Sequence, residues 1–391
     1  MDSARERTSE GSLEFRLAAA CCRWPASPAR DRALLQAAAA GIEWPRFARV
    51  VRRQRIEGLA NAALKQAGAD VPEDVASELA AASAAIAHEN LLHTAASLRL
   101  QSAFEEAGIP VLHVKGVTLS LLAYGTLSIK KARDIDIVVR PEAIGAAFDL
   151  LRASGHRCLS ADGEAGEAAT GAKETVWEDQ AGILVELHSG LVDNPMMLPG
   201  VGVDSPVQLV EVAPGKRLPT LRKDELFSYL CVHGATHAWS RLKWLADVAA
   251  LLSQGDGAEI ERLHRRSIEL GAGRSSAQAL LLCARLLGTP VPPQLLKELS
   301  SDAPTRWLVR VALRSMAGET ELDATVLGTI PIHLSHFFLA RGPRYKLAEL
   351  KRKSGGRPNA AGSVPRFLRW FGPLVAVPLW LRTRARERIR R

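Results

Sequence analysis

Two aspartates alternate with isoleucines in the segment Arg133-Asp-Ile-Asp-Ile137, and carboxylates at this spacing can bind a metal ion. The β-branched residues around them predict a strand over 134–140. Asp134 and Asp136 then project from one face of that strand, with Cα atoms roughly 6.5–7 Å apart. Two carboxylates on one face repel each other unless a cation lies between them. Mg²⁺, or Mn²⁺ in its place, is the expected cofactor, because it prefers hard oxygen ligands and shares its coordination shell with phosphates.

A second acidic position lies in the segment Ile183-Leu-Val-Glu-Leu-His188, where Glu186 and His188 share one strand face with Leu184. If this strand lies beside the first, Glu186 completes a site of three carboxylates. Such a site can hold two divalent ions about 4 Å apart, one on a triphosphate and one lowering the pKa of an attacking hydroxyl. The third carboxylate can act as the base for that hydroxyl. The alternative is that the aspartates are surface or turn acids. The metal site is favoured because each of the two strands carries its acidic residues on one face.

Basic residues occur just before the aspartate pair and again about a hundred residues later. Lys130, Lys131 and Arg133 can bind a triphosphate or offset the repulsion between the aspartates; the alternative is a solvated basic loop. Lys243 is predicted to bind or position the phosphates. The alternative for Lys243 is a simple ion pair with Asp247, four residues later on a helix.

Histidines and tryptophans flank Lys243 in the segment from His233 to Trp244. His233 and His237 are one helical turn apart and can share a face, but a third zinc ligand is not evident nearby in the sequence. We therefore expect the histidines to pack or to hydrogen-bond against the acidic unit. Trp239 and Trp244 are expected in the core, and Arg241 is a second candidate for contacting phosphates.

The elements that must position these residues form an α/β unit of about 90 residues between two helical regions. A buried strand over 109–114, a helix over 117–124, the strand over 134–140 and a β-hairpin over 174–189 are expected. The fold class is thus α+β, with a small mixed sheet. The expected division is a disordered lead at 1–12, a helical region at 13–108, the α/β core at 109–200, a helical domain at 201–345 and a basic amphipathic tail at 346–391.

These motifs together resemble the bacterial family described as "uncharacterised nucleotidyltransferase", which belongs to the DNA polymerase β-like superfamily. The resemblance spans roughly residues 30–345 and includes Lys115-Gly116, Asp134-Ile-Asp136, Glu186-Leu-His188 and the segment 233–247. Asn90 and the segment 341–344 also fit this family. The resemblance implies a polymerase-β-like core and transfer of a nucleoside monophosphate from an NTP such as ATP to an acceptor. It also implies a biosynthetic acceptor.

By this resemblance Asp134, Asp136 and Glu186 are the catalytic and metal-binding carboxylates. The superfamily has Gly-Ser or Gly-Gly where this chain has Lys115-Gly116, so a lysine ammonium would replace a serine hydroxyl on the phosphate. Backbone N–H groups at the start of the following helix would assist it. His188 is grouped with the nucleotide-binding residues. Glu186 replaces the commoner aspartate, so its carboxylate reaches one methylene further.

The net charge of +9 is unevenly distributed along the 391 residues. Residues 341–391 contain 15 Lys/Arg and two acids, a net +13, so the remaining residues carry a net −4. This distribution does not favour a long nucleic-acid footprint. The segment 366–391 combines apolar, Trp-containing and basic stretches, and three roles remain open for it: contact with an anionic membrane surface, docking of a partner, or simple packing.

The compartment expected for the chain is the cytoplasm, with membrane association through the tail as an addition. Five scattered cysteines show neither a disulfide framework nor a metal-ligand spacing, which is typical of reduced thiols. The first residues are polar and lack the apolar stretch of a signal peptide. The expected function is NMP transfer to a hydroxyl or phosphate of a small molecule, peptide or protein. The alternatives are an inactive nucleotide- or partner-binding module and a transferase that acts on nucleic acid.

Overall fold

The structure is a computed structural model that describes residues 11–160, 174–318 and 329–355. Two of the sequence predictions lie mostly or wholly outside the described residues. They are the disordered lead at 1–12 and the basic tail at 346–391, with its segment 366–391.

A five-stranded mixed sheet forms the centre of the α/β unit, with the strand order β1-β2-β5-β4-β3. The strands are β1 (Leu112–His113), β2 (Asp134–Val138), β3 (Arg157–Cys158), β4 (Glu174–Glu178) and β5 (Leu184–His188). Strands β2 and β5 pair in parallel, whereas the other neighbours are antiparallel. The α+β class and the hairpin of β4 and β5 are therefore confirmed. The first strand is shorter than the predicted 109–114.

The two faces of this sheet have opposite chemistry because residues alternate along each strand. The odd-numbered residues of β2, Ile135 and Ile137, are buried with Val185 and Leu187 of β5 in one apolar cluster. Phe148 of helix α8 (Ile144–Ala153) and Phe104 of α6 (Glu73–Glu106) belong to the same cluster. The even-numbered residues of both strands face the other way, which places the carboxylates on the face opposite this cluster.

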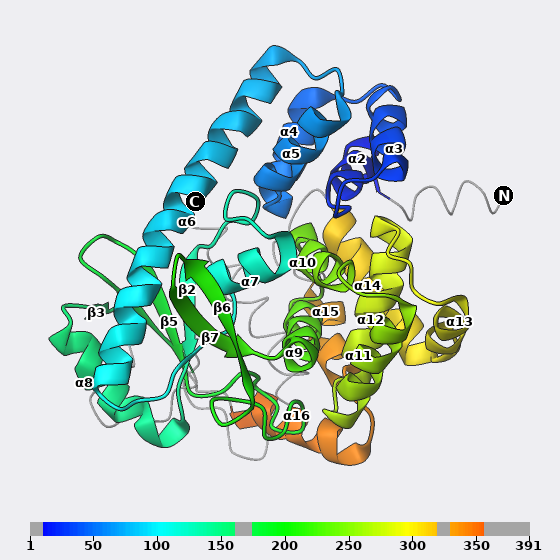
Figure 1. Cartoon of the computed structure of the whole chain (residues 1–391). Coiled ribbons are helices and arrows are strands. Elements are labelled where there is room, and N and C mark those ends of the chain that lie inside the picture. The colour runs from blue at the N-terminus through cyan, green and yellow to red at the C-terminus, as the bar shows by residue number, and fades with distance from the viewer. Residues whose placement is uncertain (1–10, 161–173, 319–328, 356–391) are drawn as a thin grey trace, which may run out of the picture.

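Proline and glycine mark several ends of the N-terminal helices. They are α2 (Leu13–Cys21), α3 (Pro28–Ala38), α4 (Trp44–Gln54), α5 (Glu57–Ala67) and the 34-residue α6. Pro45 lies in the first turn of α4. Helix α6 ends two residues before Gly108, which adopts a left-handed φ of 67°. Figure 1 shows α6 running alongside the sheet, with α2 to α5 clustered near its first turns.

A β-hairpin lies where the sequence analysis placed the start of a helical domain. Strands β6 (Val207–Ala213) and β7 (Lys216–Leu221) pair around a turn that contains Gly215 at a φ of 68°. The expectation that residues 201–345 are helical is therefore wrong for residues 207–221. Alternation along β6 buries Val210 and Val212 against helix α7 (Gly116–Tyr124), and this tertiary contact stabilises an otherwise exposed hairpin.

The remaining helices form the C-terminal helical region that the sequence predicted. They are α9 (Lys223–Thr236), α10 (Leu242–Leu252), α11 (Gly257–Glu269), α12 (Gly273–Leu282), a π-helical turn (Cys283–Leu287), α13 (Pro293–Ser301), α14 (Ala303–Ala317), α15 (Thr329–Ser335) and α16 (Pro343–Gly355). Their largest apolar core also contains Phe15, Leu34 and Phe47 of the N-terminal helices. The domain boundaries within the chain stay a prediction. Among the described residues, no helix has both the length and the apolar character needed to cross a bilayer.

Candidate metal and nucleotide site

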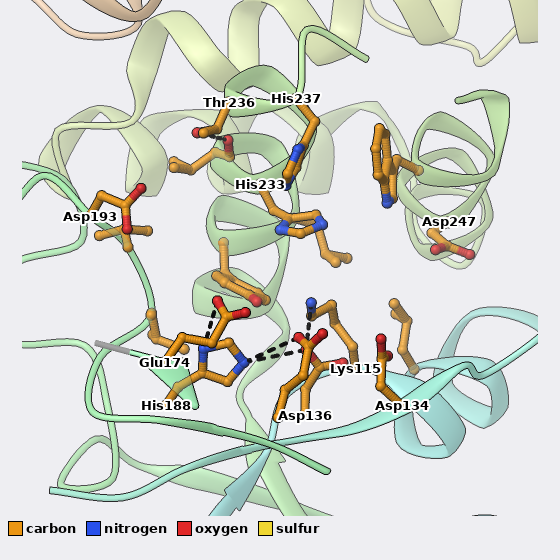
Figure 2. Close-up of a pocket in the computed structure, with 18 of the residues that line it drawn as sticks. Lys115, Asp134, Asp136, Glu174, His188, Asp193, His233, Thr236, His237 and Asp247 are labelled. Carbon is orange, nitrogen blue, oxygen red and sulfur yellow. Dashed lines mark hydrogen bonds and ion pairs between the residues drawn. The ribbon is translucent and has the colours of Figure 1, made fainter. Parts of the chain in front are cut away.

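A cavity of about 370 Å³ lies between the carboxylate-bearing face of the sheet and helices α9 and α10 (Figure 2). Its floor is formed by β2, β5 and the N-terminus of α7. One wall is formed by α9 and α10, and another by the loop after β5 together with the segment 336–352. All nine site residues predicted from the sequence line it: Lys115, Gly116, Lys130, Arg133, Asp134, Asp136, Glu186, His188 and Lys243. The structure thus places them together, while their roles in binding and catalysis stay predictions.

The carboxylates meet on this floor because of the register between β2 and β5. Asp136 is directly opposite Glu186 in the parallel pair. Asp134 and Asp136 both point into the cavity in Figure 2. Ligand atoms of Asp136, Glu186 and His188 all lie within 4.8 Å of one another, which is close enough for one metal ion to contact all three. The neighbouring strand that Glu186 required is therefore present.

Asp136 is the most buried carboxylate of this group, at 3% exposure, and it is surrounded by cations. Lys115 Nζ lies 2.6 Å from Asp136 Oδ1, and His188 Nε2 lies 3.5 Å from the same oxygen. Burial alone would raise the pKa of Asp136, but Lys115 and His188 hold it well below its ordinary value. Asp136 is consequently ionised at any physiological pH.

His188 lies among three carboxylates, Asp136, Glu174 and Glu186, at distances of 3.5, 3.6 and 3.6 Å. Burial opposes its charged form, but the nearby carboxylates of Asp136 and Glu186 raise the pKa of His188 to about 9. The imidazole is therefore protonated at neutral pH in this arrangement. A metal ion held by Nε2 would have to displace that proton.

The pKa of Asp134 moves in the opposite direction to that of Asp136. Burial raises its pKa to about 6, and repulsion from Asp136 and Glu186 adds to the effect, against the weaker attraction of Lys115 and Lys243. A divalent cation among these oxygens would relieve the repulsion. The residues therefore fit a hard divalent ion, since oxygen donors crowd together in a partly buried cluster.

The start of α7 brings backbone donors to the cavity. Gly116 is its first residue and has a φ of 62°, a conformation that favours glycine. Lys115 directly precedes it and contributes the ammonium that pairs with Asp136. The free N–H groups of the first helical turn therefore lie beside the carboxylates, where they can bind phosphate oxygens.

The basic loop before β2 is fixed by a single buried side chain of α6. Asn90, fully buried, donates to the carbonyls of Leu127 and Lys130 at 2.5 and 2.7 Å and accepts from the backbone N–H of Ala132 at 3.0 Å. Gly58 of α5 supports the same loop, because a Cβ there would lie 2.3 Å from the carbonyl oxygen of Ile129. The loop is thus held in one conformation.

Lys130 is a structured residue, not part of a solvated loop. Its Nζ lies 3.0 Å from Asp247 Oδ2, and only 11% of its side chain is exposed. Tyr124 donates a hydrogen bond of 3.0 Å to the other oxygen of Asp247. The salt bridge to Asp247 that was considered for Lys243 is therefore made by Lys130. Lys131 instead extends to Glu89 on the surface, 2.8 Å away.

The histidines of α9 form an aromatic wall with Trp244. The ring of His237 stacks on Trp244 with centroids 5.0 Å apart, and His233 contacts both rings. Burial lowers the pKa of both histidines, and the positive charge of nearby Lys115 lowers it further. Both histidines are therefore neutral. The packing role expected for them matches these ring contacts. Gly234 fits beneath Trp239, whose ring atoms would lie 2.4 Å from an added Cβ.

The wall opposite the lysines contains residues that the sequence analysis missed. Asn194 and Glu349 are buried and hydrogen-bonded to each other at 3.2 Å, and Arg352 links Glu349 to Asp193. His336 joins this wall to the end of α9 through the carbonyl of Thr236, 2.9 Å away. Local patterns could not reveal them, since they lie up to 237 residues from Lys115 in sequence (115 to 352). Arg55, at the end of α4, was missed for the same reason.

Comparison with known proteins adds one positive finding. A family model described as "uncharacterised nucleotidyltransferase" matches residues 40–288, which is more than half of the chain. The matched range contains all nine predicted site residues and the whole of the five-stranded sheet. A search of curated proteins found no match.

Proposed function

The chain belongs to the uncharacterised nucleotidyltransferase family, and from this premise we propose that it is a metal-dependent enzyme. It transfers an NMP from an NTP to a hydroxyl or phosphate of a small-molecule, peptide or protein acceptor. Mg²⁺ or Mn²⁺ is its cofactor. The observation that carries the proposal is the convergence of three carboxylates on two in-register parallel strands, inside a cavity that also holds lysines.

In this proposal Asp134, Asp136 and Glu186 hold the metal. When bound, a divalent ion neutralises phosphate charge and lowers the pKa of the acceptor hydroxyl. The acceptor oxygen forms a bond to the α-phosphorus while the bond from the α-phosphorus to the bridging oxygen of pyrophosphate breaks. Glu186 receives the hydroxyl proton, since 25% of its side chain is exposed, against 2% for Asp136.

Two further groups act on the phosphates. The N-terminus of α7 offers backbone N–H groups, and the cavity wall holds them beside the carboxylates. Lys115, which pairs with Asp136 in the structure, supplies a cation for the triphosphate once a metal takes over the neutralisation of Asp136. The arrangement therefore supports binding of an NTP with its α-phosphate over the carboxylates.

The test is label transfer from α-³²P-NTP to candidate acceptors, followed by mass analysis of the labelled product. The double variant Asp134→Ala with Asp136→Ala is expected to reduce turnover at least about 1,000-fold, since both proposed metal ligands are lost. Asp149→Ala is the matched control, because Asp149 lies on α8 with 83% of its side chain exposed. Turnover by the double variant equal to wild type would show that the assignment is wrong.

A non-catalytic nucleotide-binding module is the second candidate, and one observation favours it. Asp136 is already paired with Lys115 at 2.6 Å and with His188 at 3.5 Å, so its charge is neutralised without a metal. For such a module, calorimetry would detect NTP binding while pyrophosphate release stays at background across a broad acceptor screen. Pyrophosphate release that depends on Asp134 would exclude this candidate.

A further inference from the structure

Three cations from three separate parts of the chain line one end of the cavity. Arg55 follows helix α4, Lys130 lies in the loop before β2, and Lys243 is the second residue of α10. The first and last are 188 residues apart in sequence (55 to 243). Their meeting at one place is a property of the tertiary structure alone.

Asp247 already has two partners at this end of the cavity. Asp247 bonds to Lys130 at 3.0 Å and accepts a hydrogen bond from Tyr124 at 3.0 Å. Burial lowers the pKa of Lys243 to about 7, and the positive charges of Lys130 and Arg55 add to that effect against attraction from Asp247 and Asp134. Lys243 thus lies beside two like charges in a partly buried place, where a bound anion would favour its charged form.

The backbone presents Arg55 to this cluster in an uncommon conformation. Arg55 has φ 56° and ψ 49°, in the left-handed region that non-glycine residues seldom adopt. Such outliers persist where the surroundings determine them and tend to occur at functional sites. Among the four non-glycine residues with positive φ in the described part of the chain, Arg55 is the one that lines the cavity.

A buried glutamine fixes the position of Arg55 relative to Lys243. Gln54 is fully buried, and its Oε1 accepts a 2.7 Å hydrogen bond from the backbone N–H of Leu242, the first residue of α10. Its Nε2 donates to the carbonyl of Met316 at 2.9 Å. The residues directly after Gln54 and Leu242 are Arg55 and Lys243. The two cations are therefore held together by the same side chain.

We propose that Arg55, Lys130 and Lys243 form the subsite for the β- and γ-phosphates of the NTP, with Arg55 as its phosphate clamp. This inference rests on the proposed function and extends it to a residue of the N-terminal helical region. A guanidinium can donate two parallel hydrogen bonds to one phosphate, and the two ammonium groups neutralise the remaining charge. The α-phosphate then lies toward Asp134, on the side where the carboxylates are.

The test uses inorganic tripolyphosphate as the probe and the full chain, by calorimetry in EDTA, so that side chains alone produce the signal. Arg55→Gly removes the clamp and places a residue that tolerates a φ of 56°, so the fold is retained. We expect its Kd to rise at least about tenfold, the loss associated with one charge-assisted hydrogen-bonding group. Arg55→Lys keeps the positive charge but lacks the guanidinium that donates two parallel hydrogen bonds. Its Kd is expected to lie between those of Arg55→Gly and wild type.

Arg52→Ala is the matched control, because Arg52 lies on the same helix, 52% exposed, and pairs with Glu78 on the surface. Its Kd should equal that of wild type. The inference is overturned if wild type does not bind tripolyphosphate, if Arg55→Gly binds within about twofold of wild type, or if Arg52→Ala weakens binding as much.

The outcome is separable from that of the proposed function. Tripolyphosphate contains no α-phosphate ester, so its binding requires no transfer to an acceptor. A chain that binds it through Arg55 but never labels an acceptor contradicts only the proposed function. A chain whose Arg55→Gly variant transfers label with an unchanged KM for NTP contradicts only the phosphate subsite.

Discussion

Single residues at this site have protonation states that depend on their neighbours. Asp134 and Asp136 have the same side chain and lie two positions apart on one strand, yet their pKa values move in opposite directions. Asp136 has Lys115 beside it, whereas burial and two neighbouring carboxylates act on Asp134. A metal ion must therefore displace a proton from Asp134 at mildly acidic pH, but not from Asp136.

Metal affinity should consequently depend on pH. The pKa of Asp134 is about 6, and the ion binds its carboxylate form, so affinity rises as pH increases through that value. We expect the Kd for Mn²⁺ to fall by about tenfold per pH unit below pH 6 and to level off above it. Calorimetric titrations between pH 5 and pH 9 measure this.

The same titrations report on His188. A rise in Mn²⁺ affinity that continues to pH 9 would indicate that the ion also displaces the proton of His188, whose pKa is about 9. A Kd that is constant between pH 5 and pH 7 would contradict the role given to Asp134. Asp134→Asn should bind more weakly and lose the dependence below pH 6, because its amide does not titrate.

At the scale of elements, the basic loop before β2 depends on the helix that passes behind it. Three hydrogen bonds connect Asn90 of α6 to the loop backbone. Because Lys130 and the start of β2 lie within or directly after this loop, α6 positions both Lys130 and Asp134. The helix thus contributes to the site without supplying a side chain to the cavity wall.

Asn90→Ala should therefore destabilise the fold and disturb the site together. It leaves the buried N–H of Ala132 without its partner, and we expect the free energy of unfolding to fall by about 2–3 kcal/mol. Chemical denaturation measures this, and the Kd for tripolyphosphate should rise in the same variant. Ser83→Ala on the same helix removes a single 3.4 Å hydrogen bond to Ser128 and should have little effect. Equal effects of the two substitutions would contradict the argument.

Elements differed in how far the sequence could predict them. Strand β2, helix α7 and the hairpin of β4 and β5 have local patterns strong enough to be recognised, and the structure confirms them. The hairpin of β6 and β7 was missed. Residues 216–221 contain two basic residues and Pro219, a composition unfavourable for a strand. Packing of Val210, Val212 and Leu218 beside Val117 of α7 overrides that weak local preference.

Across the whole molecule, the two helical regions and the α/β unit share the residues that define the site. One apolar core combines residues of α2 and α4 with residues of α9, α10 and α14. The segment 329–355 lies beyond the family match at 40–288, yet it supplies one wall of the cavity. The N- and C-terminal helical regions therefore act as one support for the cavity.

Glu349 is the residue through which this support is best tested. It is 2% exposed and contacts Asn194, Arg352 and Lys353. Glu349→Ala leaves two cations without their shared carboxylate, and we expect the free energy of unfolding to fall by about 2 kcal/mol or more. Thermal unfolding at neutral pH measures this. Glu269→Ala, which removes a 58% exposed partner of Arg266, should change it by less than about 0.5 kcal/mol. A wild-type Tm for Glu349→Ala would contradict the structural role.

The sequence by itself determined the features that depend on short-range periodicity. The alternation of side chains along a strand places Asp134 and Asp136 on one face, and Glu186 and His188 on one face of another strand, whatever the rest of the chain does. Proline and glycine likewise set the ends of helices such as α4 and α6. The family resemblance rested on these same local motifs, and the match at 40–288 confirms it.

Only the tertiary structure decided which of these faces meet and what surrounds them. Parallel pairing in register placed Glu186 opposite Asp136, and packing of α4 against α10 brought Arg55 to Lys243. The pairing of Lys130 with Asp247, in place of Lys243, was settled in the same way. The physical reason is that contacts between distant segments depend on how the whole apolar core packs. Local sequence patterns do not contain that information.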